Sequence, residues 1–209
     1  MTINSKKIGI INYGVGNLRS LKNCIDSLDF DAQLVDDPKN LKNYDKIVLP
    51  GVGSFKNAMH LINSLGWDHE ILENILVKKK KILGICLGMQ ILLSEGYEFG
   101  NTKGLNLVLG KVENLKILGC NKLIPHIGWN EVFIKQDNML FKNIPNNSSF
   151  YFVNSYACKL TNESQELSST NYGINFTSIL NDQNIYGTQF HPEKSSKVGR
   201  QLLNNFLNA

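Results

Sequence analysis

Short apolar runs alternate with amphipathic stretches through the first half of this 209-residue chain. We expect four strands here, over residues 6–12, 32–35, 45–50 and 81–85. Short apolar runs bounded by turn residues are typical of buried parallel strands. In the first stretch between them, apolar side chains recur on one helical face at Leu18, Leu21, Ile25 and Leu28, and Asn17 can cap this helix.

Further helices are expected from about residue 56 to residue 80 and over residues 87–96. The alternation of strand and helix predicts a mostly parallel sheet with helices on both faces. The second half instead shows strand-like runs with little helix between them, before a last helix from about residue 195 to residue 207. These runs cover residues 131–135, 150–158, 177–182 and 185–190, and residues 182–184 are expected to form a hairpin turn. The prediction is a single α/β domain over residues 1–209.

Composition narrows the class of protein. Hydrophobic residues make up 42% and charged residues 19% of the chain, as in an ordinary soluble globular protein. The formal net charge of +4 is too small and too dispersed to indicate nucleic-acid binding. No apolar run approaches the roughly 18 residues needed to cross a bilayer, and residues 1–14 do not resemble a signal peptide. We therefore expect a cytoplasmic protein that binds neither membranes nor nucleic acid.

The cysteines and glycines exclude several kinds of site. Cys24, Cys86, Cys120 and Cys158 are scattered without C-x-x-C spacing, which argues against structural zinc and a disulfide framework. Other metal-ligand spacings are missing as well. The glycine pair at positions 14 and 16 lacks the third glycine of a dinucleotide fingerprint, and no phosphate-binding loop motif exists. We expect neither a metal nor a cofactor.

The strongest chemical signal is a cysteine between two glycines. Gly84, Cys86 and Gly88 stand between an apolar strand and an expected helix. This arrangement is the thiol counterpart of the nucleophile elbow, in which a tight turn lifts the nucleophile above the sheet edge. Unpaired amides at the start of the helix would favour the thiolate. A buried inert cysteine is the alternative, but the flanking glycines favour a nucleophile.

A nucleophilic cysteine needs a base and a group that orients the base. His191 directly follows the strand at residues 185–190, and Pro192 biases it toward an extended conformation. Residues two apart in an extended segment project to the same side, so Glu193 can lie beside the imidazole. His60 and His69 lie in helical segments and are expected at the surface. A third segment, residues 49–55, follows a strand and contains Gly51 and Gly53, whose exposed amides suit an oxyanion hole.

These residues resemble the class I glutamine amidotransferases, whose triad of cysteine, histidine and glutamate corresponds to Cys86, His191 and Glu193. More narrowly, motifs at residues 13–20, 49–55, 125–130, 151–156 and 191–195 are similar to those of the glutaminase subunits of imidazole glycerol phosphate synthases. The resemblance runs from the first strand to the last helix. It implies a three-layer fold with an added antiparallel portion in the second half.

The resemblance also implies a substrate and a partner. Family members release ammonia from L-glutamine and pass it to a (β/α)8-barrel cyclase subunit, which makes imidazole glycerol phosphate and an aminoimidazole carboxamide ribotide in histidine biosynthesis. The positions that match the family's oxyanion and substrate-binding residues are Gly51, Val52, Gly53, Leu87, Gln90, Glu98, Ser155 and Tyr156. Those that match its contact surface with the cyclase are Asn17, Trp129, Tyr151 and Lys194, and His126 belongs to a contact-surface motif.

One position departs from the family pattern. Asn154 stands where the family usually has histidine, and asparagine can hydrogen-bond as a neutral imidazole does but cannot become cationic. Asn154 is not part of the expected triad, so the departure does not bear on glutamine hydrolysis itself. It bears on how hydrolysis is coupled to the partner, and on which pathway uses the ammonia. Two alternatives to the synthase subunit therefore stay open. One is an amidotransferase subunit of a sugar-amidination pathway, and the other is a catalytically idle binding protein of the same fold.

Overall fold

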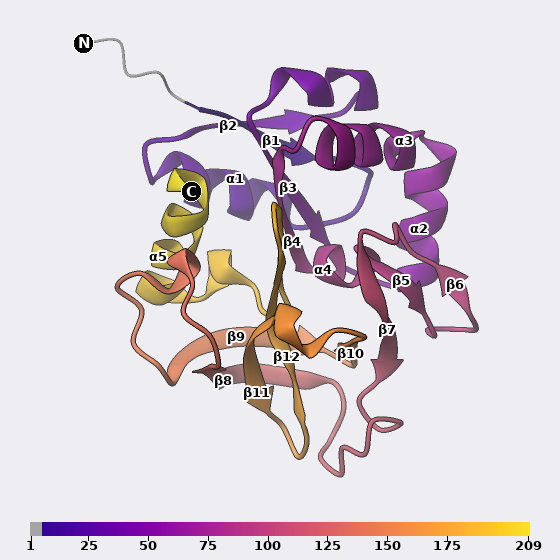
Figure 1. Cartoon of the computed structure of the whole chain (residues 1–209), viewed down its shortest axis with the longest axis vertical. Helices are drawn as coiled ribbons and strands as arrows, with labels where there is room; N and C mark the ends of the chain where they lie inside the picture. The colour runs from indigo at the N-terminus through magenta and orange to yellow at the C-terminus, as the bar shows by residue number, and fades with distance from the viewer. Residues whose placement is uncertain (1–5) are drawn as a thin grey trace.

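A computed structural model describes residues 6–209 and contains two sheets. The nine-stranded sheet has the order β2-β1-β3-β4-β13-β12-β11-β8-β9 and dominates the molecule (Figure 1). Its strands are β1 (Lys7–Ile11), β2 (Asp31–Val35), β3 (Lys46–Gly51), β4 (Lys81–Cys86), β8 (His126–Ile134), β9 (Ser148–Asn154), β11 (Glu166–Asn171), β12 (Asn175–Asp182) and β13 (Ile185–Thr188). The four-stranded sheet joins β10 (Tyr156–Leu160), β7 (Val108–Asn114), β5 (Leu93–Gly96) and β6 (Thr102–Lys103) in that order. Residues 1–5, part of the segment considered as a targeting signal, lie outside the described residues.

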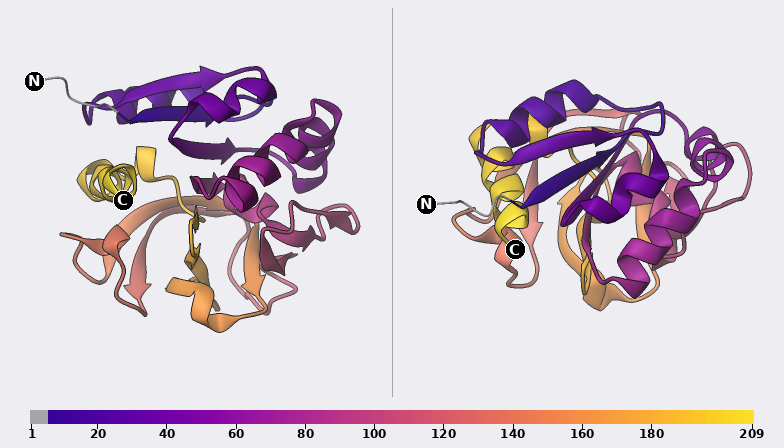
Figure 2. Two further views of the ribbon diagram at one scale, coloured as in Figure 1. Left: turned by 45° about the horizontal axis from the view of Figure 1, so that its top comes forward. Right: turned by 90° about the horizontal axis from the view of Figure 1, so that it is seen from above.

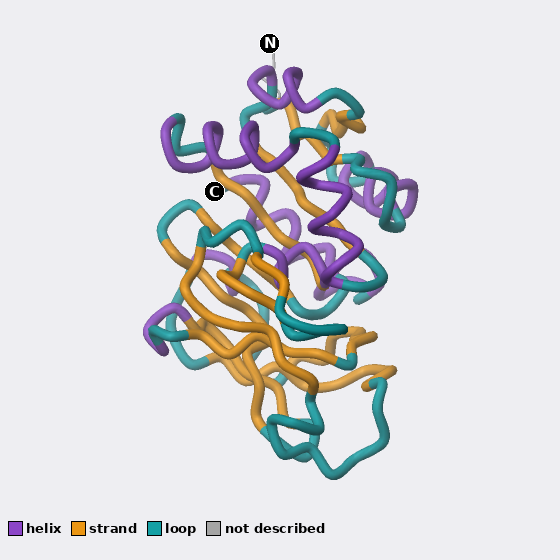
Figure 3. Tube along the Cα trace, turned by 90° about the vertical axis from the view of Figure 1, so that its right-hand side faces the viewer, coloured by secondary structure: helices purple, strands orange, loops and turns teal. Residues whose placement is uncertain are grey.

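The large sheet is parallel in one half and antiparallel in the other. Pairs from β2 to β13 run parallel, whereas pairs from β13 to β9 run antiparallel. The expected hairpin is confirmed, because β12 pairs with β13 from Asp182 opposite Ile185. Helices gather around the parallel half, while strands and loops make up most of the rest (Figure 3). The predicted α/β class with an antiparallel portion in the second half is confirmed.

Helices cover both faces of the parallel strands. The α-helices are α1 (Leu18–Asp26), α2 (Phe55–Ser64), α3 (Trp67–Leu72), α4 (Leu87–Ile91) and α5 (Ser196–Asn208). A π-helical turn, η2 (Glu73–Val77), extends α3, and 3-10 turns occur at η1 (Pro38–Asn43), η3 (Met139–Phe141), η4 (Glu163–Gln165) and η5 (Pro192–Lys194). The side chain of Asn17 accepts a hydrogen bond from the amide of Ser20, which confirms the predicted cap of α1.

Successive side chains along the parallel strands belong to two different hydrophobic clusters. On β3, Val48 belongs to the cluster that includes α1 and α5, whereas Ile47 and Leu49 belong to the cluster that includes α2, α3 and α4. Successive strand residues point to opposite faces of a sheet, so this split places the two sets of helices on opposite sides. Figure 2 shows the two sets separated by the parallel strands.

Two sequence-based predictions of element boundaries are wrong. The helix expected over residues 87–96 ends at Ile91, and Leu93–Gly96 forms β5 instead. The backbone of this segment pairs with β7 and β6, so tertiary hydrogen bonding overrides the helical pattern. The single strand expected over residues 150–158 is divided at Ser155. β9 stays in the large sheet, and β10 crosses into the small one.

The crossing of β3 by the turn after β4 leads to the first testable prediction. A Cβ atom at Gly88 would lie 1.8 Å from the carbonyl oxygen of Leu49. That oxygen belongs to the backbone, so it cannot move aside as the end of a flexible side chain can. Gly88→Ala should therefore lower the free energy of unfolding by roughly 3 kcal/mol or more, as measured by urea denaturation. Gly100→Ala is the control, because Gly100 has φ +102° but open space around it, and should cost about 1 kcal/mol. Equal losses in the two variants would contradict the steric argument.

Candidate active site

The three segments singled out in the sequence meet at one edge of the large sheet. They follow β3, β4 and β13, which are neighbouring parallel strands with β4 in the middle. Gly51 pairs with Cys86 across β3 and β4, and Thr188 pairs with Ile85 across β13 and β4. Parallel strands present their carboxyl ends at the same edge, where α/β proteins usually bind ligands. The expected convergence of these segments is therefore observed.

Cys86 occupies a strained turn between β4 and α4. Its backbone has φ 54° and ψ −110°, a conformation that a residue with a side chain seldom adopts. A Cβ atom at Gly84 would lie 2.6 Å from the carbonyl oxygen of Gly88, so the turn closes only with glycine there. The tight packing that the elbow motif predicted is thus present. α4 has only five residues, so the unpaired amides of its first turn matter more here than a long helix dipole.

The sulfur of Cys86 lies between an acceptor and a donor. Its Sγ atom is 3.7 Å from the carbonyl oxygen of Val153 and 3.7 Å from Nε2 of Gln189. The residue is only 7% exposed, yet it lines a cavity of about 240 Å³. A small, partly enclosed cavity with a nucleophile on its wall suits a small substrate.

His191 and Glu193 form a buried pair. Nδ1 of His191 lies 2.9 Å from Oε1 of Glu193, and their side chains are 5% and 4% exposed. The predicted contact is observed, but its geometrical basis was wrong. His191 is extended at φ −97° and ψ 97°, and the chain then enters the 3-10 turn η5, which folds Glu193 back onto the ring. The carboxylate holds Nδ1, so Nε2 is the nitrogen available for proton transfer.

The environment of His191 favours its protonated form. Burial lowers the pKa of His191, but hydrogen bonding to Cys86 and Glu193 and the negative charges of both groups raise it from 6.5 to about 10. An imidazolium between a thiolate and a carboxylate is stabilised by both charges. The arrangement can therefore hold a proton on the imidazole for delivery to a leaving group.

Ser195 holds the backbone of His191 in place, a role that the sequence did not reveal. The Ser195 hydroxyl donates to the carbonyl oxygen of His191 over 2.6 Å and accepts from the amide of Tyr151 over 3.0 Å. The amide of His191 in turn donates to the carbonyl oxygen of Tyr151 over 2.9 Å. Ser195 is fully buried. These three hydrogen bonds connect β9 to the turn that carries His191. The His-Pro-Glu-Lys-Ser run was the available signal.

Ten of the residues proposed from the sequence line the cavity, namely Val52, Gly53, Cys86, Leu87, Gln90, Glu98, Ser155, Tyr156, His191 and Lys194. Gly51 lies behind its wall, where a Cβ atom would meet the hydroxyl of Tyr13 at 2.6 Å and Leu87 at 3.0 Å. Glycine at position 51 is thus required by the close approach of β3 to the elbow. Burial raises the pKa of the Tyr13 hydroxyl, and the charge of Cys86 raises it further, so this phenol stays neutral.

Gln90 and Glu98 reach the cavity from different elements. Nε2 of Gln90 donates to the carbonyl oxygen of Tyr156 over 3.1 Å and to Oε1 of Gln189 over 3.0 Å. Oε2 of Glu98 accepts from the amide of Phe55 over 2.7 Å, at the start of α2. Both side chains are therefore held by hydrogen bonds in the described residues, which pre-organises one wall of the cavity.

The residues proposed as a partner-contact surface come from four different elements around the site. Trp129 is 54% exposed on β8 and makes an edge-to-face contact with Tyr151 on β9, with ring centroids 6.1 Å apart. Asn17 caps α1, and Lys194 lines the cavity from η5. Tyr151 thus lies on a strand whose backbone binds His191, and Trp129 lies opposite it on the neighbouring strand.

His126 and Asn154 face each other across β8 and β9. Burial lowers the pKa of His126 to about 4, although the side-chain oxygen of Asn154 acts in the opposite direction. His126 stacks on Tyr172 at 4.0 Å between ring centroids, and its Nε2 lies 3.3 Å from Nδ2 of Asn130. The imidazole is therefore neutral and accepts from Asn130. Asn154 also lines the cavity, and neither it nor Gln189 was included among the candidate site residues.

Neither a metal-binding cluster nor a membrane-spanning helix is found among the described residues. Within residues 6–209, no group of three or more histidine, cysteine or acidic side chains is arranged to hold a metal ion. No helix in that range combines the length and the apolar character needed to span a bilayer. Cys24, Cys86, Cys120 and Cys158 are all free thiols.

Comparison with known proteins gives a consistent result. Residues 9–209 match the family model for glutamine amidotransferase class-I. The chain is 45% identical over 199 residues to the imidazole glycerol phosphate synthase subunit HisH of Chlorobaculum tepidum, covering 94% of this chain and 97% of that protein. It is 42% identical over 199 residues to the subunit of the same name from Caldanaerobacter subterraneus, covering 95% and 96%.

Solved structures confirm the fold. A glutamine amidotransferase structure superposes with a TM-score of 0.76 at 16% identity, covering 96% of this chain and 97% of that one. The PurLQS structure from Thermotoga maritima gives a TM-score of 0.76 at 17% identity and covers 98% of both chains. At such low identity these likenesses concern the arrangement of the elements alone.

The buried pair at His191 leads to a prediction on pH. Glu193→Gln replaces the carboxylate with a neutral amide, so the imidazolium loses one of its two stabilising charges. The wild-type imidazole should stay protonated above pH 6.5 and lose its proton near pH 10, whereas the variant should lose it at least about one pH unit lower. Nitrogen NMR of the imidazoles measures both midpoints. The ring nitrogen signals of His60, which is exposed on α2, should be the same in the two proteins at a given pH. An unchanged midpoint for His191 would contradict the role given to Glu193.

Proposed function

Because the chain belongs to the glutamine amidotransferase class-I family, we propose that it is the glutaminase subunit of an imidazole glycerol phosphate synthase. It hydrolyses L-glutamine to glutamate and ammonia and supplies the ammonia to a cyclase subunit. The observation that carries this proposal is the meeting of Cys86 and His191 at one cavity, with Glu193 bound to His191 behind it, in a chain that matches synthase subunits over nearly its full length. We also propose that residues 1–209 form one glutamine amidotransferase domain, of which residues 9–209 match the family model.

Catalysis begins with the thiolate of Cys86, which attacks the side-chain carbonyl carbon of glutamine. The carbonyl electrons move to its oxygen, and backbone amides at Gly53 and Leu87, both on the cavity wall, bind the oxyanion. His191 then delivers a proton to the departing nitrogen, and ammonia leaves as the thioester forms. The raised pKa of His191 suits this step, because the proton is already on the ring when the substrate arrives.

Hydrolysis of the thioester uses the same groups in reverse. After ammonia has left, neutral His191 takes a proton from water, and the hydroxide attacks the thioester carbonyl. Collapse of this second oxyanion releases glutamate and the thiolate, and His191 is again protonated. Glu193 keeps Nδ1 occupied throughout, so the exchange of protons occurs at Nε2.

The rest of the cavity holds the substrate. We assign Gln90, Glu98, Ser155 and Tyr156 to the binding of glutamine, together with the backbone of residues 51–53. Glu98 supplies a carboxylate that can pair with the substrate's ammonium group, and it is held by the amide of Phe55. A charged group that is already oriented costs less to use in binding than a mobile one.

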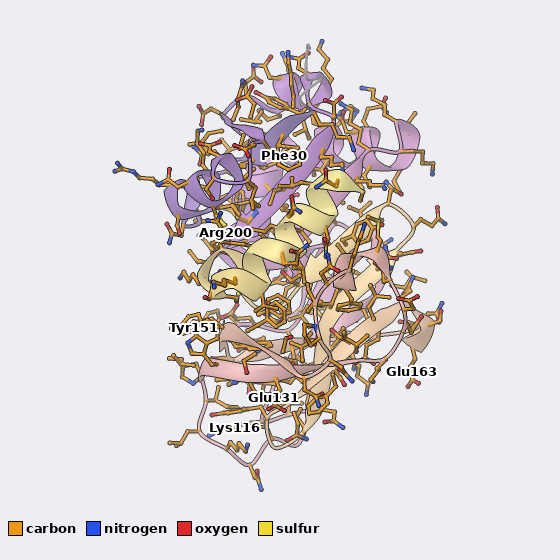
Figure 4. All side chains as sticks on the ribbon, turned by 90° about the vertical axis from the view of Figure 1, so that its left-hand side faces the viewer. Phe30, Lys116, Glu131, Tyr151, Glu163 and Arg200 are labelled. Carbon is orange, nitrogen blue, oxygen red and sulfur yellow. The ribbon has the colours of Figure 1, made fainter. Side chains whose placement is uncertain are left out.

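The partner docks on the face of β8 and β9. Ile127, Trp129 and Phe133 point outward from β8 and are 60%, 54% and 39% exposed, so this strand presents an apolar row that only Glu131 interrupts. Figure 4 labels Tyr151 and Glu131 on the same pair of strands, below α5. Such an exposed row marks an interaction surface. We propose a (β/α)8-barrel cyclase as the partner, contacted through Asn17, Trp129, Tyr151 and Lys194, with His126 supporting the surface from beneath.

The identity of the partner determines the pathway that uses the ammonia. Ammonia passed to the cyclase would yield imidazole glycerol phosphate and an aminoimidazole carboxamide ribotide in histidine biosynthesis. The four free cysteines fit the reducing cytoplasm, where we place the protein. Asn154 leaves the triad itself unaltered, because its side chain donates to the carbonyl oxygen of Tyr156 rather than to a triad residue. A sugar-amidination pathway and an idle binding protein remain outcomes of the following tests.

The nucleophile is tested by mutation in the complex. With the cyclase subunit of the same organism present, Cys86→Ala should lower glutamate release at least about 10³-fold, because no other group can form the thioester. Cys120→Ala is the control, since this buried thiol donates to the carbonyl oxygen of Tyr172 away from the cavity. Intact turnover by Cys86→Ala would refute the nucleophile assignment. Failure of the cyclase to stimulate the wild-type protein would refute the pathway instead.

The docking face is tested separately. Trp129→Ala removes the largest side chain of the apolar row and should weaken binding of the cyclase at least about tenfold by calorimetry. Leu65→Ala is the matched control, because Leu65 is 52% exposed at the end of α2, in the helical half of the molecule. Equal affinities for the two variants would mean that the partner docks elsewhere.

A further inference from the structure

Gln189 is a fully buried glutamine at the back of the candidate active site. It follows β13 and precedes His191 by two positions, and its amide donates to the carbonyl oxygen of Ser178 over 2.9 Å. Gln189 and His191 both direct their side chains to Cys86, at the end of β4. A buried carboxamide needs partners for both of its ends, and those partners identify its role.

The orientation of the Gln189 side chain is determined by a backbone group. The carbonyl oxygen of Tyr156 can only accept, and it lies 3.1 Å from Nε2 of Gln90, so the NH2 end of Gln90 faces it. The same nitrogen lies 3.0 Å from Oε1 of Gln189. Gln189 must therefore present its oxygen to Gln90. Its own NH2 end is left facing Sγ of Cys86, at 3.7 Å.

The N–H donor of Gln189 interacts differently with the thiol and with the thiolate of Cys86. A thiol can donate to the carbonyl oxygen of Val153, which lies 3.7 Å from Sγ. A thiolate cannot donate to that oxygen, so it needs a donor on this side in addition to the imidazolium of His191. The N–H of Gln189 then supplies the hydrogen bond, and bonds to ionised acceptors are about twice as strong as neutral ones. Gln189 thus favours the form that attacks.

We propose that Gln189 is a further catalytic residue, whose side-chain N–H stabilises the thiolate of Cys86 and aims it at the substrate. When the thiol ionises, its proton passes to Nε2 of His191, since Nδ1 is held by Glu193. The sulfur keeps the electron pair, and Gln189 keeps its proton throughout. This inference rests on the proposed function, because it assumes that Cys86 is the nucleophile.

A purely structural role would be to hold Gln90 at the substrate-binding wall. Two variants separate the roles. Gln189→Glu keeps an oxygen for Nε2 of Gln90 but presents a carboxylate oxygen to the sulfur, whereas Gln189→Met removes both polar ends. Gln201→Met is the matched control, because Gln201 lies on α5 and bonds to Asn205 over 2.8 Å.

The measurement is the pH dependence of alkylation of Cys86 by iodoacetamide in the full chain, followed by mass spectrometry of the peptide that contains residue 86. Both Gln189 variants should move the midpoint upward by at least about one pH unit, a tenfold loss of thiolate at a fixed pH below it. Gln189→Glu should shift it further, because a carboxylate beside a thiolate is repulsive. Gln201→Met should alkylate as the wild-type protein does.

Turnover with the cyclase subunit supplies a second readout. Gln189→Glu should lower kcat about tenfold or more while KM changes less than threefold, because Gln90 keeps its partner. Unchanged alkylation midpoints, or a rise in KM alone, would overturn the inference and leave Gln189 a structural residue. If Gln189→Met does not fold, Gln189→Glu decides by itself. Alkylation needs no turnover, so failure here is distinct from failure of the Cys86→Ala test of function.

Discussion

The site depends on one close passage of backbone past backbone, where the turn after β4 crosses the end of β3. The α-carbon of Gly88 lies so near the carbonyl oxygen of Leu49 that no side chain fits between them. At that passage Cys86 has a positive φ, and Gly51 packs against the turn that carries Cys86. The strain at Cys86 persists because β3 and β13 hold β4 on both sides. Nucleophile and oxyanion segment are thus positioned by the same contact.

The antiparallel half of the sheet connects this edge with the proposed docking face. Tyr151 belongs to β9, whose partner strand carries the exposed Trp129, yet its backbone also binds His191 and Ser195. A displacement of β9 by a docked partner would therefore act directly on the backbone that carries the imidazole. Tightly packed hydrogen-bonded elements transmit such displacements, because they deform little. The fold thus offers a short physical route from partner to catalyst.

The sequence predicted the fold class, the triad and most of the cavity, because each depends on local signals. Glycines around Cys86, a proline after His191 and apolar runs before both segments suffice to place them at strand ends. The helix expected at residues 87–96 was wrong because pairing with β7 is a long-range contact that periodicity cannot show. Gln189 and Ser195 were missed for the same reason, since their roles depend on partners far away in sequence. The single-domain organisation and the individual residue roles remain predictions.

The departure at Asn154 fits the electrostatics of the cavity. His126, which faces it, is kept neutral by burial, and Nδ2 of Asn154 donates to the carbonyl oxygen of Tyr156. A second ionisable imidazole here could add a positive charge to a buried wall, and an unpaired buried charge is costly. It would also oppose the proton on His191, on which ammonia release depends. A neutral amide avoids both effects and still supplies the donor that the Tyr156 carbonyl uses. Asparagine at this position is therefore compatible with the same hydrolysis, by the same triad.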